Sequence, residues 1–376
     1  MPKYVTHNAD GSGDGSSLSS PWAIAQAAAS AVAGDEVRIC ATGTYELSST
    51  LTITAAGSVS GKIKYWGASA AGAVDGTRTL IRPTSGLTGN LLASVQPYLW
   101  LRNLELDARD SGGVARADRL WDTTANNTGS PGVIEGCDIH HAKIDGLKLR
   151  TVAYALINCR VHHCTQVGVN VNSTSDSIRL YGTVCDHNGS HGFSTGNGHT
   201  HAIRSMFYRN GGNGVYSASG EGSGFRLIDS LFYANASAGI YIATLNKALP
   251  SNTIYGCTAA ANGTYGYRIA SVDDDAELAT YVELFCGNHS HGNSSGHANW
   301  ASSDAAWQAT GNGANSIVAP AFASTTDGAE DFSSSALEAI GWPSSFLAGG
   351  SPRWGIGPMG QAAGGSGPII IIEGDD

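Results

Sequence analysis

Histidines are concentrated in one part of the sequence, where they recur at a regular spacing. Eight of the twelve histidines fall between residues 140 and 201. One repeated position is occupied by His140, His162 and Asp186. The next position is occupied by His141, His163 and His187. Rows of imidazole and carboxylate groups could bind a transition metal or supply a base near pH 7.

A structural role competes with both kinds of chemistry. On neighbouring strands, about 4.8 Å apart, the rings would stack in a straight row, whereas a metal needs ligands that converge from different directions. Histidine can also replace the Asn and Ser residues that are common at bends. We therefore favour a structural role. The metal candidates are His140, His162 and Asp186, and no resident cofactor is predicted.

A second row of side chains suits carbohydrate binding. Two residues after each of six recurrent glycines, at an expected outward position, stand Lys148, Asn170, Ser194, Tyr216, Tyr241 and Arg268. Aromatic rings stack on sugar faces, and Lys, Asn and Arg bind hydroxyl and carboxylate groups. The carbohydrate-binding residues predicted here are Lys148, Asn170, Tyr216, Tyr241 and Arg268. The alternative is a solvated face or a subunit contact.

A repeat of short strands must position both rows. Blocks of alternating apolar residues recur from residue 133, and a Gly with a following apolar residue closes each one: Gly146, Gly168, Gly192, Gly214, Gly239 and Gly266. The intervals are 22, 24, 22, 25 and 27 residues. Period-2 alternation inside such a repeat predicts stacked strands in coils of about 24 residues.

An asparagine column supports the same register. Four residues before the glycine stand Asn188, Asn210, Asn235 and Asn262, and Asn288 is expected to hold this place before Gly292. Asparagine tolerates the left-handed backbone of a tight turn, and stacked amides can hydrogen-bond from coil to coil. The column predicts a structural ladder.

The composition agrees with a large β protein and argues against two kinds of partner. The 376 residues include 50 glycines, only 14 % are charged, and the net charge is −10. This acidity argues against a nucleic-acid partner, and the apolar runs are too short for membrane insertion. Of the seven cysteines, at least one thiol has no internal partner, and Cys137 and Cys159 are expected to be buried as small apolar residues.

Several segments resemble the right-handed parallel β-helix proteins of the pectate-lyase-like superfamily. The opening, with Asp10-Gly11-Ser12-Gly13-Asp14-Gly15 and Pro21-Trp22, is similar to the capping segment of that family. Gly61–Gly67 resembles the following coil, and Asn315-Ser316-Ile317 resembles the closing segment. The resemblance spans about residues 4–345 and implies an all-β, right-handed parallel β-helix. It is almost silent on activity.

A short helix is expected to cover the first coil. Ser20 is a suitable N-cap, Pro21 fits the first helical position, and Gly34 can end the helix. Such a helix would protect the open end of the solenoid, where strand edges are otherwise unpaired.

The catalytic motifs of β-helix depolymerases are incomplete in this sequence. Hydrolysis needs paired carboxylates, and elimination needs a base together with charge neutralisation. Asp107, Arg109 and Asp110 follow the expected strand Leu99–Leu106 and form the nearest acidic and basic cluster. They are the catalytic candidates, although we favour a protein that is not an enzyme.

The chain divides into four predicted parts: an N-terminal cap at 1–45, β-helix coils at 46–298, a closing segment at 299–360, and a Gly-rich linker with an Ile-rich tail at 361–376. Four isoleucines after the linker, Ile369, Ile370, Ile371 and Ile372, have high strand propensity. We expect this tail to pair with the sheet edge of another chain. A disordered end, or a strand folded back on its own body, is the alternative.

Together these patterns favour a phage-like virion structural protein, such as a capsid decoration, fibre or adhesin, that could also bind surface glycans. No signal-peptide pattern follows Met1, which favours synthesis in a host cytoplasm. The expected partners are further copies of the chain, as a trimer, and other virion proteins. The alternative is a secreted polysaccharide lyase or glycoside hydrolase acting in a groove along the β-helix.

Overall fold

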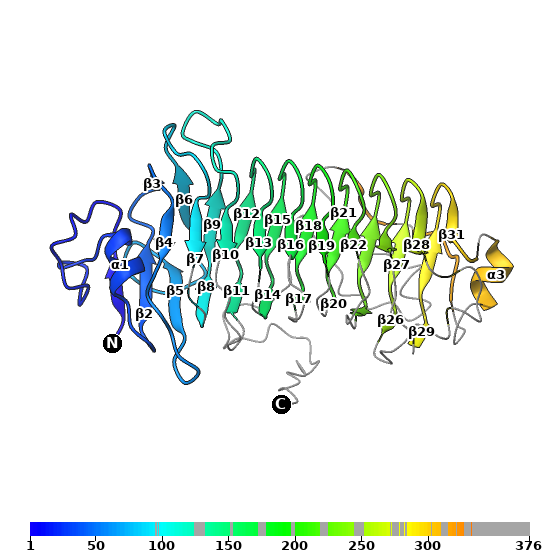
Figure 1. Cartoon of the computed structure of the whole chain (residues 1–376), viewed down its shortest axis with the longest axis horizontal. Helices are drawn as coiled ribbons and strands as arrows, with labels where there is room; N and C mark the ends of the chain where they lie inside the picture. The colour runs from blue at the N-terminus through cyan, green and yellow to red at the C-terminus, as the bar shows by residue number, and fades with distance from the viewer. Residues whose placement is uncertain are drawn as a thin grey trace.

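Successive coils of the chain each contribute a short strand to three parallel sheets, and the coils stack along one long axis (Figure 1). This computed structural model describes residues 1–94, 96, 98–123, 132–150, 153–171, 178–196, 200–218, 225–243, 252–270, 272, 278, 282, 284–301, 303–309, 315–320, 322–326 and 332. From β2 onward, consecutive strands along the chain belong to different sheets, so each sheet pairs a strand with its counterpart one coil later.

The first sheet contains β1 (Lys3–Val5), β2 (Glu36–Cys40), β5 (Ile63–Ala68), β8 (Leu99–Arg102), β11 (Gly132–Glu135), β14 (Tyr154–Ile157), β17 (Ile178–Tyr181), β20 (Thr200–Ile203), β23 (Phe225–Ile228), β26 (Thr253–Tyr255) and β29 (Leu284–Cys286). The second sheet contains β3 (Tyr45–Leu47), β6 (Thr79–Pro83), β9 (Leu104–Asp107), β12 (Asp138–His140), β15 (Arg160–His162), β18 (Val184–Asp186), β21 (Met206–Tyr208), β24 (Leu231–Tyr233), β27 (Thr258–Ala260) and β30 (His289–His291). The third sheet contains β4 (Leu51–Ile53), β7 (Leu92–Ser94), β10 (Trp121–Thr123), β13 (Leu147–Leu149), β16 (Val169–Val171), β19 (Phe193–Thr195), β22 (Val215–Ser217), β25 (Ile240–Ile242), β28 (Tyr265–Ile269) and β31 (Gly296–Ala298).

Alternating side chains fill the space between the three sheets. In β13, Leu147 and Leu149 are buried while Lys148 between them is half-buried on the outer face. The same alternation recurs in β16 and β25. Each coil therefore buries its apolar side chains against the coils before and after it, as in other solenoids.

The glycine column marks a close contact between coils. A Cβ on Gly168 would lie 2.7 Å from the carbonyl oxygen of Gly192, and one on Gly192 would lie 2.8 Å from that of Gly214. Real Cβ atoms do not approach backbone oxygens this closely. Glycine recurs here because the stacked backbones leave no space for a side chain.

The asparagine ladder forms as predicted, with one correction at its end. Hydrogen bonds run from Nδ2 to Oδ1 of the next coil, from Asn188 to Asn210 (3.1 Å), onward to Asn235 (2.9 Å) and to Asn262 (3.0 Å). Asn262 then bonds to Asn293 at 2.8 Å. The placement of Asn288 in this ladder was wrong, because the last coil is longer than the repeat.

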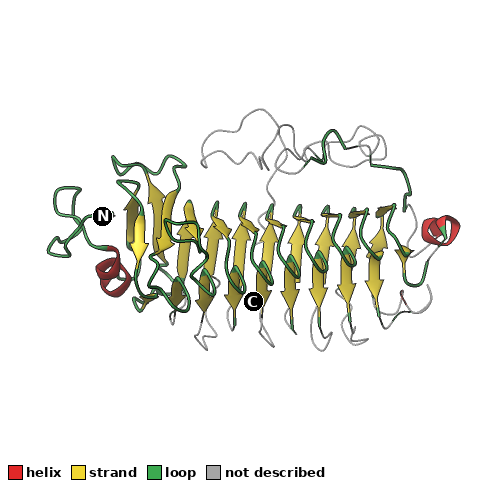
Figure 2. Cartoon of the chain, turned by 90° about the horizontal axis from the view of Figure 1, so that it is seen from above, coloured by secondary structure: helices red, strands yellow, loops and turns green. Residues whose placement is uncertain are grey.

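A helix lies at each end of the solenoid: α1 (Ile24–Ser30) at the first coil and α3 (Asp304–Ala309) at the last (Figure 2). The predicted N-cap at Ser20 was wrong, because α1 begins after Ala23 with no side-chain cap. The carbonyl of Ser20 instead accepts a hydrogen bond from the Gly15 N–H (2.8 Å), and the Trp22 N–H bonds to the carbonyl of Tyr4 at 2.8 Å. The segment before α1 thus stays extended beside β1.

Part of the closing segment packs on the outside of the second sheet. Phe332 is buried against Tyr208 and Tyr233, and Phe322 packs against Tyr233 and Phe332. This contact covers an apolar stretch that faces away from the core. The Ile-rich tail, including Ile369 to Ile372, lies outside the described residues, and the four-part division of the chain stays a prediction.

All seven cysteines are free thiols, and Cys137 and Cys159 are buried as expected. The Cys159 thiol lies 3.3 Å from the carbonyl oxygen of Ile134 in the preceding coil. These side chains act as small filling groups where the chain bends between the first and second sheets.

The glycine column gives a direct test of coil stacking. Gly168→Ala should lower the free energy of unfolding by about 1–3 kcal/mol, because the new Cβ forces neighbouring backbones apart. Gly86→Ala is the matched control, since its Cβ would meet nothing nearer than Thr84 Oγ1 at 3.9 Å. Urea unfolding measures both, and equal losses in the two variants would contradict the stacking argument.

Candidate functional site

The predicted carbohydrate-binding residues lie in one column on the outer face of the third sheet. Strand register pairs Lys148 with Asn170, and continues through Ser194 to Tyr216. Tyr216 then pairs with Tyr241, which pairs with Arg268. The glycine-based counting therefore identified residues that are true neighbours, although their binding role stays a prediction.

A charged cluster surrounds the first residues of this column. Asp122, which is buried, accepts two hydrogen bonds from Arg150, Nε to Oδ1 at 2.8 Å and Nη2 to Oδ2 at 3.0 Å. Arg119 lies 3.5 Å from both Asp122 and the buried Asp145. Asn170 donates from Nδ2 to Asp145 at 3.0 Å. The two aspartates thus fix the arginines and Asn170 in place.

Lys148 lies beside these arginines and is the strand-register partner of Asp122 in the preceding coil. Burial, and after it the positive charges of Arg119 and Arg150, lower the pKa of Lys148 below its usual value. A lowered pKa makes the loss of the lysine proton easier, and the neutral amine can accept a proton. Sequence analysis missed Arg119, Arg150 and Asp145 because they stand outside the repeated position. It missed Asp122 because its coil precedes the first glycine of the repeat.

Aromatic rings form the other end of the column. His191 stacks on Tyr216, with ring centroids 4.6 Å apart. The Tyr216 and Tyr241 ring centroids are 5.4 Å apart. The Arg268 guanidinium lies 4.7 Å from the centre of the Tyr241 ring. Half-buried tyrosines and a stacked arginine offer flat apolar surfaces beside hydrogen-bond donors.

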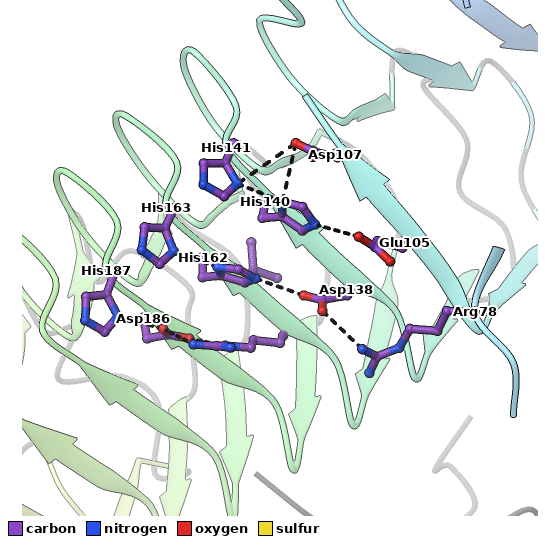
Figure 3. A network of polar contacts seen from close by, with 12 residues as sticks. Arg78, Glu105, Asp107, Asp138, His140, His141, His162, His163, Asp186 and His187 are labelled. Atoms are coloured by element: carbon purple, nitrogen blue, oxygen red, sulfur yellow. Dashed lines mark hydrogen bonds and ion pairs between the residues drawn. The ribbon is translucent and has the colours of Figure 1, made fainter. Parts of the chain in front are cut away.

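The histidine cluster occupies the second sheet (Figure 3). Register places Asp107 beside His140, His140 beside His162, and His162 beside Asp186. The rings of His140 and His162 stack with centroids 4.9 Å apart. The first histidine row is therefore a column of neighbouring side chains on the outer face of β9, β12, β15 and β18.

The second histidine row lies at the bend that follows these strands. His141, His163 and His187 have φ values of 67°, 55° and 53°, the left-handed region that histidine enters more readily than most residues. Successive rings stack at 5.1 Å. Each bend thus turns its ring toward the side chain of the preceding strand residue.

Carboxylates set the charge states in this cluster. Burial disfavours a charge on His140, but hydrogen bonds with Asp107 and Glu105 outweigh it and raise the pKa of His140 to about 9. Burial, with the nearby charges of Arg109 and His140, lowers the pKa of His141 to about 4. His140 is therefore charged and His141 neutral at pH 7.

Asp186, predicted as a metal candidate, is engaged in a buried ion pair. It accepts hydrogen bonds from Arg160 at 2.9 and 2.7 Å and from His187 at 2.7 Å. Asp138, which the sequence analysis did not select, is instead the carboxylate beside His162 Nε2 at 3.0 Å. Asp138 stands two residues before the histidine column, on the same face of the strand, and this spacing could have revealed it.

The three catalytic candidates divide into two ion pairs. Arg109 holds Asp107 through both carboxylate oxygens, with contacts of 3.0 to 3.2 Å. Asp110 pairs with Arg116 at 2.8 Å and accepts backbone N–H bonds from Gly112 and Val114, which shapes the loop after β9. Their catalytic role stays a prediction.

Comparisons with known proteins agree on the fold. A family model described as "Right handed beta helix region" matches residues 123–249. Pectate lyase Pel9A is 16 % identical over 86 % of this chain and 82 % of its own, with a TM-score of 0.56. Tailspike protein 2 of Escherichia coli O157:H7 bacteriophage CAB120 is 13 % identical over 68 % of this chain and 38 % of its own, with a TM-score of 0.36. The periplasmic alginate epimerase AlgG is 14 % identical over 73 % of this chain and 76 % of its own, with a TM-score of 0.35. No curated protein sequence matches the chain.

The stacked parallel sheets, the family-model match and the likeness to Pel9A define the class: the chain is a right-handed parallel β-helix protein. This confirms the predicted fold and the resemblance on which it was based. Identities this low show the fold alone. Within the described residues, no helix has the length and apolar character that a membrane crossing needs.

Asp186 provides a stability test with a pH signature. Burial would raise the pKa of its carboxyl, but Arg160 and His187 hold it well below the usual range. The contribution of Asp186 to the free energy of unfolding is complete above its pKa in the unfolded chain, which is about 3.9. It is lost as the pH falls through its lower pKa in the folded protein. Asp186→Asn should cost about 3 kcal/mol at pH 7, because it leaves the Arg160 charge unpaired.

Urea unfolding of the parent and Asp186→Asn proteins at pH 7 and pH 3 measures this effect. The difference in the free energy of unfolding between the two proteins should be smaller at pH 3 than at pH 7. Glu46→Gln is the control, because the Glu46–Arg82 pair is exposed and should contribute about 0.5 kcal/mol or less. A difference for Asp186→Asn that does not change with pH would contradict the assignment.

Proposed function

We propose that the outer face of the third sheet binds an acidic polysaccharide laid along the solenoid axis. The observation that carries the proposal is one continuous column, with the Lys148 cluster at one end and the neighbouring Tyr216, Tyr241 and Arg268 at the other. Lysine and arginine bind uronate carboxylates, and the tyrosine rings offer stacking surfaces for the sugars.

Charge balance favours an anionic ligand at the first end of the column. Arg119, Lys148 and Arg150 contribute three cations, whereas Asp122 and Asp145 contribute two carboxylates that already accept hydrogen bonds or ion pairs. A uronate carboxylate would supply the missing negative charge. The likeness to Pel9A supports only the fold, so the proposal depends on these side chains.

Binding of polygalacturonate, measured by calorimetry or affinity electrophoresis, tests the proposal. Arg268→Ala and Tyr216→Ala should each weaken the Kd by about tenfold, the equivalent of one lost charged hydrogen bond or stacking contact. Arg226→Ala is the matched control, since Arg226 is an exposed outward residue of β23 on the first sheet. Equal weakening by Arg226→Ala, or equal binding of neutral dextran, would refute the proposal.

A second candidate function is elimination on the same polysaccharide, favoured by the lowered pKa of Lys148. The neutral Lys148 amine would take the proton from C5 of a uronate, while Arg119 or Arg150 stabilises the carboxylate. The C5–H electron pair forms the C4–C5 double bond, the C4–O4 bond breaks, and the departing oxygen takes a proton from water.

Ultraviolet absorbance of the unsaturated product tests this step. Cleavage should rise with pH as Lys148 loses its proton, and Lys148→Met should abolish it while Arg268→Ala changes mainly KM. Binding without any absorbance change would leave the protein as a binding module and exclude elimination on that polymer.

The virion role stays a prediction beside these proposals. Its main support, the Ile-rich tail, lies outside the described residues, and neither the trimer nor the virion location is tested by the fold. A polysaccharide-binding face is compatible with a virion adhesin and with a secreted enzyme, so the proposed binding does not depend on that choice.

A further inference from the structure

Three polar atoms converge at the carboxyl ends of β9 and β12 in the second sheet, away from the proposed polysaccharide face on the third sheet. Nδ1 of His140 lies 2.7 Å from Nδ1 of His141 and 3.4 Å from Oδ1 of Asp107, and His141 Nδ1 lies 3.9 Å from the same oxygen. Figure 3 shows both rings directed toward Asp107. The three groups come from β9, from β12 and from the bend after β12.

The bend is what allows two consecutive histidines to meet. Neighbouring residues of a strand normally point to opposite faces of the sheet. His141 has a φ of 67°, which turns its ring back to the face that carries His140. The ligand set therefore depends on this left-handed bend as well as on the strand register.

These distances suit a tetrahedral metal ion. Ligand atoms bound at 2.0–2.1 Å with tetrahedral angles are separated by about 3.3 Å. Two of the three separations, 3.4 and 3.9 Å, lie near this value. The third is a 2.7 Å hydrogen bond between the two Nδ1 atoms, and it would lengthen when a metal ion replaces the shared proton. We propose that Asp107 Oδ1, His140 Nδ1 and His141 Nδ1 bind a divalent first-row transition ion such as Zn²⁺.

The groups around the three ligands fit the same assignment. Nε2 of His140 lies 3.4 Å from Glu105, so a carboxylate orients the ring from behind, as is usual for metal-bound histidine. Arg109 donates from Nη2 to Asp107 Oδ2 at 3.0 Å and from Nε to Oδ1 at 3.0 Å, and its backbone N–H donates to Oδ1 at 2.9 Å. These contacts fix the carboxylate beside the two rings. The His141 side chain is 28 % exposed, so solvent can supply a fourth ligand.

The two following coils repeat the bend without repeating this ligand set. His162 and His163 have their Nδ1 atoms 2.7 Å apart, but the carboxylate near His162, Asp138, contacts Nε2 instead. In the third coil, Asp186 is occupied by Arg160. His163 is therefore a matched control for His141: it has the same bend and the same stacking, but no carboxylate beside its Nδ1 atom.

Replacing either bend histidine by alanine should preserve the fold. Ala234 and Ala261 already occupy the same left-handed bend in later coils, with φ values of 50° and 55°. A loss of metal binding in His141→Ala can therefore be assigned to the missing ligand. Equal urea midpoints of the metal-free variants would verify this.

The experiment titrates the full-length, metal-free protein with Zn²⁺ by calorimetry and with Co²⁺ by visible absorbance. We expect one equivalent of each ion, with the strong absorbance of tetrahedral Co²⁺. His141→Ala and Asp107→Asn should weaken the Kd by tenfold or more, and His163→Ala should leave it unchanged. Glu105→Gln should weaken it by about 10–100-fold while the stoichiometry stays at one.

Three results would overturn the proposal. Absence of saturable binding would exclude the site, and equal weakening by His141→Ala and His163→Ala would indicate diffuse adsorption on the stacked rings. Weakening by His162→Ala but not by His141→Ala would move the ion to the neighbouring group of Asp138, His140 and His162. The readout is metal affinity alone, so failure here would not affect the polysaccharide proposal.

Discussion

The close contact between successive coils is the constraint on which the rest of the structure depends. At the glycine column the backbones are so near that a Cβ on Gly214 would lie 2.6 Å from the carbonyl oxygen of Gly239. Adjacent strands of a sheet are separated by about 4.8 Å. Any residue type that recurs at one position therefore becomes a row with that spacing, and both candidate sites contain such rows.

The bends determine which rows of side chains can bring polar groups of one coil together. Outward residues such as Tyr241 stand in the middle of a strand beside their counterparts in the adjacent coils. At the left-handed bends, residues such as His141 turn back toward their own strand, so each coil presents two side chains at one point. Polar side chains converge there, and the ring nitrogen that the nearby carboxylate contacts distinguishes one coil from the next.

The sequence predicted features that repeat and missed features that occur once. The coils, the glycine column and the asparagine contacts of Asn188 to Asn262 follow from the period, because equal spacing in the chain means adjacency in space. Asn288 was misplaced because its coil exceeds the period by several residues. The cluster of Asp122, Arg119 and Arg150 was missed, since Arg119 and Arg150 lie outside the repeated position and only folding brings them together. The helix cap at Ser20 failed because the chain beside β1 pairs with the sheet before the helix begins.

Local charge and aromatic surfaces together provide a basis on which this acidic protein would distinguish one polyanion from another. The net charge of −10 repels any polyanion at long range, so attraction must come from local contacts. On the third sheet, Arg119, Lys148 and Arg150 exceed their carboxylate partners by one charge, which suits one carboxylate better than a row of phosphates. The neighbouring Tyr216 and Tyr241 rings, tilted by 48°, add an aromatic surface that suits the apolar faces of sugars better than the phosphate backbone of duplex nucleic acid. The proposed selectivity for an acidic sugar chain depends on one local charge beside an aromatic surface, and this pairing requires the charged and aromatic ends to lie on the same column.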